Sequence, residues 1–262
     1  VVEGMYKLAT ELGVKFEFDC NVTAINIDNG KATHVQAEGG KVYEADVVIG
    51  GADYHFVETK LLPENYRTYS DRYWDKRLMA PSCLLYYVGL DKKVEGVPHH
   101  YFEVHGQEIY TTQKWPTDPL FYLSVSSVTD ETVAPAGCDN LVFLIPVAAG
   151  LDADTEELRE KYFQKILERF ERKTGQERRN NIIYKQSYSI SNFVADYNSF
   201  KGNAYGLANT LMQTAIFRPS CRSIKIKNLF YTGQLTVPGP GVPPSLISGE
   251  VVANEIVKHF GK

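Results

Sequence analysis

The sequence predicts an α/β fold combined with an α+β unit: both chain ends build one part, and a mostly antiparallel sheet with helices builds the other. Near the C-terminus, an apolar run at 229–231 passes through a loop rich in Gly and Pro into a long segment with apolar residues at helical spacing. Near the N-terminus, a β-meander leads into a second apolar run at 45–50. Between the two ends, aromatic stretches alternate as strands around a helix at 155–173.

The composition is that of an ordinary globular protein. The chain has 262 residues, of which 44% are hydrophobic and 23% are charged, so it can bury a substantial core. A net charge of -4 and the lack of a Lys/Arg cluster offer no basic surface for nucleic acid. We therefore expect no nucleic-acid partner.

The cysteines and the apolar runs bear on the cellular compartment. Cys20, Cys83, Cys138 and Cys221 are widely spaced and form no CxxC pair, which fits a reducing cytoplasm. The longest apolar runs, such as 141–150, are too short to cross a bilayer. We expect a cytoplasmic protein that can also lie peripherally against a membrane face.

The first 62 residues are predicted to form a helix, a meander and a buried strand. Asn29 and Gly30 make a strong hairpin turn between two alternating segments. Asp53 is placed to cap a following helix. The expected elements are a helix over 5–12, strands over 14–18, 21–28, 31–37, 41–44 and 45–50, and a helix over 55–62.

The middle of the chain reads as strands separated by turns that contain Gly or Pro. The helix over 155–173 has the clearest pattern, with Asp154 as its N-cap and Glu157 three residues further on. Its apolar stripe consists of Leu158, Tyr162, Phe163, Ile166, Leu167 and Phe170. The expected strands cover 82–90, 100–105, 120–127, 140–148 and 182–190.

The Gly- and Pro-rich loop before the last helix is a candidate ligand site. Gly239 and Gly241 let backbone approach a ligand more closely than a side chain would permit. Pro243 and Pro244 fit the first turn of a helix, where a missing N–H costs little. The free N–H groups of such a helix start favour an anion or a polarised oxygen, although a tight turn without a ligand fits the same residues.

The sequence offers little support for a metal site or for the familiar hydrolytic motifs. His99, Glu103 and His105 would point the same way along a strand, but they need not be close enough to share one ion, and no fourth ligand is evident. A solvated strand face explains them more simply, so we predict no metal. The chain has no GxSxG, HExxH, P-loop or Cys-His signature, and we assign no catalytic residue.

Two stretches carry a resemblance to a known family. The string YTGQLTVPGPGVPPSLISG at 231–249 closely resembles the C-terminal flavin-contacting segment of the phytoene desaturase family, the bacterial carotenoid desaturases of the flavin amine oxidase superfamily. The string YGLANTLMQTAIFRPS at 205–220 resembles a sequence in which a helix leads into FRP beside the substrate cavity. The stretch 63–203 resembles the family mainly in its pattern of elements.

The resemblance implies a set of FAD contacts. Carried over by position, these are Gly233, Gln234, Gly241, Val242 and Pro243 at the flavin. Val22 matches a strand residue that touches adenine, although an ordinary core valine fits the strand equally well. Many superfamily members have Asp or Glu where this chain has Gln234, and an amide oxygen can still accept a hydrogen bond from a ribityl hydroxyl.

The resemblance also implies an organisation and a function. Residues 1–62 and 225–262 would form a partial, Rossmann-like FAD-binding domain, and 63–224 a substrate-binding domain. The dinucleotide fingerprint of the family lies upstream of everything matched here, so the chain reads as the C-terminal part of a longer FAD-dependent oxidoreductase and is expected to be inactive alone.

The implied reaction is desaturation of a long apolar isoprenoid, such as phytoene or a carotenoid. The many aromatic residues of the predicted sheet suit a tunnel for such a substrate, although Tyr and Phe are also good strand residues. The alternatives are a saturase, an isomerase or an amine oxidase of the same superfamily. A lipid- or protein-binding module without catalysis is the alternative from another class.

Overall fold

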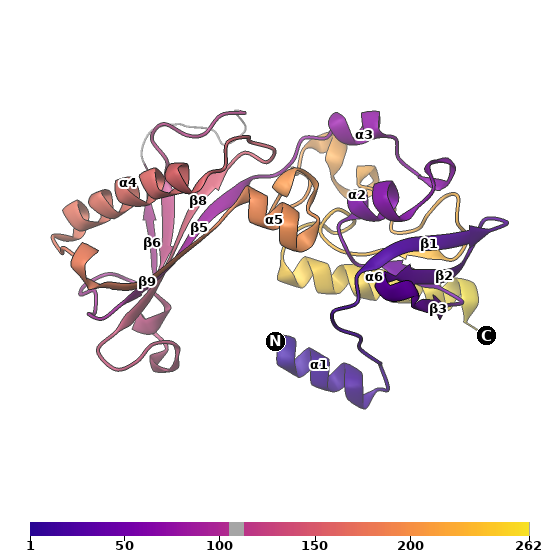
Figure 1. Ribbon diagram of the computed structural model, residues 1–262, viewed down its shortest axis with the longest axis horizontal. Coiled ribbons are helices and arrows are strands. Elements are labelled where there is room, and N and C mark those ends of the chain that lie inside the picture. Colours follow the sequence, from indigo (N-terminus) through magenta and orange to yellow (C-terminus); the bar gives the residue numbers. More distant parts are fainter. Residues whose placement is uncertain (105–112, 262) are drawn as a thin grey trace.

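The computed structural model describes residues 1–104 and 113–261, and Figure 1 shows two bodies joined near one helix. We call the part built on a five-stranded sheet the sheet body (82–104 and 113–190) and the part that contains both chain ends the terminal body (1–80 and 199–261). Helix α5 (Ile190–Tyr197) lies between them.

The sheet body is an antiparallel sheet with a helix on one face. Its strand order is β6-β7-β8-β5-β9, and α4 (Glu156–Thr174) packs against one side (Figure 1). The Tyr86 and Phe163 rings lie 5.1 Å apart in the shared core. The strands are β5 (Ser82–Leu90), β6 (His100–Glu103), β7 (Phe121–Ser124), β8 (Asp139–Val147) and β9 (Ile182–Tyr188).

The terminal body brings the two ends of the chain together. Strand β10 (Leu229–Tyr231) pairs in parallel with β4 (Val48–Gly50), which confirms the predicted contact between these distant runs. The Asn228 side chain accepts a hydrogen bond from the Ala32 N–H at 2.8 Å and donates one to the Asp46 carbonyl at 2.7 Å. It therefore ties the meander to the parallel pair.

The remaining elements of the terminal body surround this pair. The meander is a three-stranded sheet in the order β1-β2-β3, and a long helix, α6, follows the loop after β10. The elements are α1 (Val2–Glu11), β1 (Val22–Asp28), β2 (Lys31–Ala37), β3 (Val42–Glu44), α2 (Tyr54–Phe56), α3 (Asp71–Asp75) and α6 (Val242–Phe260).

The core of the terminal body takes in residues from the middle of the chain. Trp74 is fully buried and Leu207 almost so, and both pack with Leu229 and Tyr231. The predicted boundaries near 62 and 225 placed Trp74 and Leu207 in the other domain. The division of the chain into functional domains stays a prediction, but packing joins these segments to the chain ends.

Three local predictions were wrong. Residues 14–18 form no strand, and all five are exposed without a neighbouring strand to pair with. Thr155, not Asp154, caps α4 by accepting from the Leu158 N–H, because Asp154 is held by Arg159 at 2.7 Å. The stretch before Arg218 forms only short 3-10 turns over Leu211–Gln213 and Ala215–Phe217 rather than a helix.

The two helices at the chain ends contribute little to the core. No residue of α1 is buried, and it stands apart from the rest of the terminal body in Figure 1. In α6 only Ser248 and Val252 are buried. Within 1–104 and 113–261, no helix is long and apolar enough to cross a membrane.

Candidate functional site

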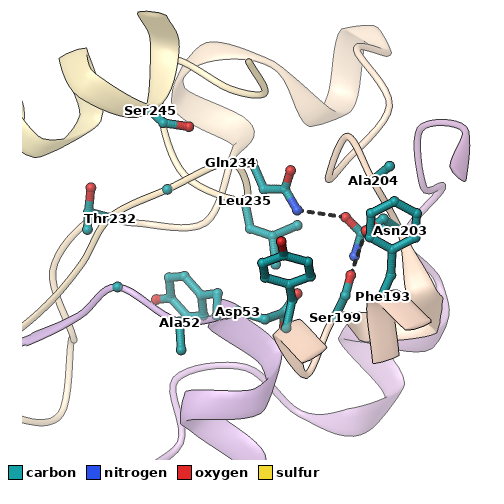
Figure 2. Close-up of a pocket in the computed structure, with 14 residues that line it drawn as sticks. Ala52, Asp53, Phe193, Ser199, Asn203, Ala204, Thr232, Gln234, Leu235 and Ser245 are labelled. Atoms are coloured by element: carbon teal, nitrogen blue, oxygen red, sulfur yellow. Dashed lines mark hydrogen bonds between the residues drawn. The ribbon is translucent and has the colours of Figure 1, made fainter. Parts of the chain in front are cut away.

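A cavity of about 490 Å³ lies where the terminal body meets α5 (Figure 2). The end of β4, the start of α2, α5, the loop after β10 and the first turn of α6 all contribute to its wall. The lining residues are Gly51, Ala52, Asp53, Tyr54, Phe193, Tyr197, Ser199, Asn203, Ala204, Thr232, Gly233, Gln234, Leu235 and Ser245.

The turn at Gly233 ends β10 at this wall. Gly233 has φ +108, and a Cβ added there would meet nothing within 4 Å, so the backbone faces open space. Its N–H donates to the Ser248 hydroxyl at 3.0 Å, and the Thr232 hydroxyl donates to the same oxygen at 3.0 Å. Helix α6 therefore holds the turn in place through the buried Ser248.

The side chain of Gln234 has a defined orientation (Figure 2). The Asn203 Oδ1 accepts from the Gly206 N–H at 2.8 Å, and the Asn203 Nδ2 donates to the Phe200 carbonyl at 2.7 Å. Because one backbone partner is a donor and the other an acceptor, they fix the orientation of the Asn203 amide. The Gln234 Nε2 then donates to Asn203 Oδ1 at 3.0 Å. The Gln234 amide oxygen then lies on the far side and accepts no hydrogen bond from the described residues.

Two further residues hold the backbone of Gln234. The buried Arg218 donates to the Gln234 carbonyl at 3.2 Å, and burial lowers the pKa of its guanidinium. Gly206 has φ +69, and a Cβ there would lie 2.8 Å from the Gln234 carbonyl oxygen. Only glycine allows this close approach. Gln234 is thus held by Asn203, Gly206 and Arg218.

Asp53 is the only carboxylic acid among the described residues that line the cavity. Its Oδ1 accepts from the Phe56 N–H at 3.2 Å, and its Oδ2 accepts from the Phe200 N–H at 3.1 Å. Burial raises the pKa of this carboxyl, and the backbone donors offset the effect only in part. With both oxygens engaged, Asp53 joins α2 to the segment around Phe200.

A second cavity of about 300 Å³ adjoins the first. Val22 lines it together with the β4 residues Val48 and Gly50. Gly51 and Ala52 line both cavities, so the two lie next to each other at the end of β4. We call the two adjoining cavities together the path; Val22 lines one of them, and Gly233 and Gln234 line the other.

The predicted residues at the start of α6 lie outside this path. Gly241, Val242 and Pro243 line neither cavity, whereas Ser245, one turn further on, lines the first. Gly241 has φ +115, and a Cβ there would come within 3.3 Å of Pro244. The turn itself therefore requires glycine at 241, whatever else it contacts.

Several lining residues were not predicted from the sequence. Asp53 was assigned only as a helix cap, and Asn203, Gly51 and Ser199 were given no role. Their contacts join segments far apart in the chain: Phe200 with Asp53, and Asn203 with Gln234. The one local signal was the pair of small residues at the end of the apolar run, Gly51 and Ala52.

Of the three residues considered for a metal, His99 and Glu103 have other partners. His99 Nδ1 lies 2.7 Å from the Thr129 hydroxyl, and Glu103 pairs with Arg169 at 3.6 Å. His105 lies outside the described residues. No group of three or more potential metal ligands gathers in the part of the chain that the structure describes.

Known sequences resemble the whole chain. The profile of the flavin-containing amine oxidoreductase family matches residues 1–257. A carotenoid 3,4-desaturase of Haloarcula japonica is 40% identical over 99% of this chain and 53% of its own length. A zeta-carotene-forming phytoene desaturase of Myxococcus xanthus is 30% identical over 98% of this chain and 51% of its own. The chain thus spans about half the length of these curated relatives.

Solved structures share the fold at low sequence identity. An oxidoreductase of Methanosarcina mazei matches 97% of this chain and 53% of its own with a TM-score of 0.65 and 14% identity. A redesigned putrescine oxidase matches 98% of this chain and 52% of its own with a TM-score of 0.62 and 12% identity. The mixed α/β fold with an antiparallel sheet is therefore shared with these two solved structures, over about half of each of their chains.

Proposed function

The chain belongs to the family of flavin-containing amine oxidoreductases, and from this membership we propose that it is the C-terminal portion of an FAD-dependent desaturase that acts on a long apolar isoprenoid. The relatives named carotenoid 3,4-desaturase and phytoene desaturase support this substrate class. Because the chain spans about half of those relatives, the activity belongs to the longer protein.

The single observation that supports the cofactor most directly is the path formed by the two cavities. Val22, the residue matched to the adenine contact, lines one cavity, and Gly233 and Gln234, matched to the flavin contact, line the other. A dinucleotide is an elongated molecule, and two adjoining cavities with a predicted contact in each suit it. Gly51 and Ala52, which line both cavities, carry no long side chain.

The residues at the flavin end fit the group chemically. Gly233 has no atom within 4 Å of its would-be Cβ, so a flat ring can lie against the backbone. The amide oxygen of Gln234, left free by the Asn203 contact, can accept a hydrogen bond from a ribityl hydroxyl. The Ser245 hydroxyl, in the first turn of α6, adds a possible donor at the wall of the first cavity.

FAD, when bound, would supply the redox chemistry by accepting a hydride from the carbon chain while a second hydrogen leaves as a proton. The protein would position the cofactor and enclose the reacting part of the substrate. Gln234 and Gly233 would orient the cofactor, and Phe193 and Tyr197 would form an apolar wall on the opposite side of the cavity. Gly241, Val242 and Pro243 remain proposed contacts, because they lie beside Ser245 at the same helix start.

The terminal body fits one part of a larger nucleotide-binding domain. Parallel sheets in proteins are buried on both faces and have several strands, whereas β4 and β10 form a pair of three residues each. Ile49 of β4 remains 49% exposed. We propose that the rest of the protein adds strands to this pair and supplies the pyrophosphate site. The whole protein would work in the cytoplasm, against a membrane face that holds the isoprenoid.

The test is to purify the full-length protein and measure its visible spectrum and its reaction with phytoene in liposomes under anaerobic conditions. We expect a flavin spectrum that bleaches as the product gains conjugated double bonds. A Gly233→Val variant should lose flavin, because its side chain would occupy the open space beside the turn. A folded, colourless protein would indicate a binding module without redox chemistry. A yellow protein that ignores phytoene but oxidises an amine would indicate an amine oxidase.

A further inference from the structure

The two faces of the five-stranded sheet differ sharply. On the face toward α4, Tyr86, Phe143 and Leu123 lie side by side on paired strands, and each is at most 1% exposed. On the other face, the neighbouring residues are only partly covered, and Tyr87 is 38% exposed. Among the described residues, the face toward α4 is buried in the core, and the other face is left partly exposed.

The open face carries an apolar row that crosses all five strands. Residues directly opposite one another in antiparallel strands put their side chains on the same face, so the strand pairings define the row. We call it the transverse row: Tyr188 of β9, Leu85 of β5, Leu144 of β8, Tyr122 of β7 and Phe102 of β6. Four spacings of about 4.8 Å make it roughly 19 Å long.

The two tyrosine hydroxyls of the transverse row have hydrogen-bonding partners outside the row. The Tyr188 hydroxyl donates to Asp196 at 2.8 Å, and the Tyr122 hydroxyl lies 2.7 Å from His100 Nδ1. No member of the row carries a charge. The rings of Phe102 and Tyr122 pack at 4.8 Å, so the row is continuous at its far end.

The near end of the row reaches the cavity. The Tyr188 ring meets the Phe193 ring edge-on at 4.9 Å, and Phe193 and Tyr197 of α5 both line the 490 Å³ cavity. An apolar chain leaving the cavity past Phe193 would therefore meet Tyr188 first and Phe102 last. In the adjacent row on one side, Gln186, Ser124 and His100 are polar, while Tyr87 and Val142 are not.

We propose that the transverse row binds the tail of a linear apolar substrate whose reacting end lies in the cavity, and that Phe102 at the far end discriminates substrates by length. The inference rests on the proposed function for the cavity. A narrow apolar strip continuous with a cavity fits a single hydrocarbon chain. Burying apolar surface along such a strip supplies binding energy in proportion to the length of chain that it covers.

The proposal is tested in the full-length protein by the fluorescence of a linear polyene probe, the methyl ester of trans-parinaric acid. Two isoprenoid alcohols compete with the probe: geranylgeraniol, and solanesol, which is more than twice as long. We expect Phe102→Ser to weaken the binding of solanesol by about ten-fold and to leave the binding of geranylgeraniol nearly unchanged, because only the longer chain can extend from the cavity along the whole row to Phe102. Leu144→Ser, in the middle of the row, should weaken the binding of solanesol as well.

A control separates the row from general surface effects. Ile183 of β9 lies outside the row and is 65% exposed. The Ile183→Ser variant should therefore bind both competing alcohols with the affinity of the wild type. Phe102 is 66% exposed, so its substitution should leave the fold intact, which far-ultraviolet circular dichroism checks. The proposal is overturned if the wild type does not bind the probe, or if the Phe102→Ser variant binds both alcohols as tightly as the wild type does. Flavin content measured on the same samples reports separately on the proposed function.

Discussion

Helices α4 and α6 are equally long but are used very differently. Each has 19 residues, yet α4 buries seven of them and α6 only two. The sheet body thus completes its core within this chain, because α4 covers one whole face of the sheet. The terminal body leaves Val242, Leu246, Ile247 and Val257 of α6 exposed, and α1 buries nothing.

The difference supports our proposal that the terminal body needs the rest of a longer protein to complete it. A self-contained core needs no partner to be stable, whereas exposed apolar helix faces and a two-stranded parallel pair are features of an incomplete domain. The site lies at the boundary between the two bodies, where the cavity takes its wall from both α5 and the turn at Gly233. The following predictions test this contrast.

The largest expected effect comes from truncating the same residue type in each helix. The Phe170 ring of α4 is fully buried and meets Phe143 edge-on, while Phe260 of α6 is 44% exposed and meets Phe230 edge-on. Phe170→Ala should cost roughly 3–5 kcal/mol of unfolding free energy and Phe260→Ala about 1 kcal/mol or less. Urea unfolding of this chain measures both. Equal losses would remove the contrast between the helices.

A smaller effect is expected from glycines with similar φ in the two bodies. Gly206 has φ +69 and lies against Gln234, whereas Gly96 has φ +67 with nothing within 4 Å of its would-be Cβ. Gly96→Ala should cost about 1 kcal/mol from backbone strain alone. Gly206→Ala should cost more, because its Cβ must also displace the Gln234 carbonyl.

The Gly206 variant also tests the clamp on Gln234. In the full-length protein, Gly206→Ala should lower flavin content, and Gly96→Ala should not. Thermal unfolding and flavin absorbance on one preparation separate the two effects. If both variants retain flavin equally, the position of Gln234 does not matter for the cofactor.

The smallest expected effect is the pH dependence of two partly buried aspartates, Asp154 and Asp53. Burial acts to raise the pKa of Asp154, but the hydrogen bonds from Arg159 and Ser191 outweigh it and hold the pKa below its ordinary value. Its contribution to stability is therefore present above an unfolded pKa of about 3.9 and is lost as pH falls through the lower folded value. Burial raises the pKa of Asp53 instead.

For Asp53 the sign is reversed. Its contribution is present below an unfolded pKa of about 3.9 and is lost as pH rises through the raised folded value. Relative to Asp154→Asn, the wild type should gain stability as pH rises across this range; relative to Asp53→Asn, it should lose stability. Unfolding free energies of the three proteins between acid and neutral pH measure the slopes. Slopes of the same sign would contradict the assigned causes.

Local patterns predicted most of the elements. Alternation and the Asn29-Gly30 turn gave the hairpin of β1 and β2, and the strand over 82–90 matches β5 residue for residue. The pairing of β10 with β4 followed from two apolar runs at opposite ends of the chain. The predictions that failed depended on contacts with other parts of the chain. Asp154 pairs with Arg159 instead of capping the helix, and residues 14–18 have no partner strand.

The site was predictable only in part, because its contacts join distant segments. Gly233 and Gln234 belong to a contiguous motif that sequence can present whole. Asn203 reaches Gln234 across 31 positions, and Phe200 reaches Asp53 across 147. No local pattern encodes such pairs. The flavin contacts of Val22, Gly241, Val242 and Pro243 stay predictions.

The most direct measurement of the account is the affinity for FAD of this chain and of the full-length protein, determined side by side by titration with absorbance and fluorescence. The full-length protein should hold about one flavin per chain. This chain alone should bind FAD only weakly, because it offers two ends of a path without the pyrophosphate site, and partial contacts rarely offset the entropy lost on association. Tight FAD binding by the isolated chain, or a folded full-length protein without flavin, would contradict the account.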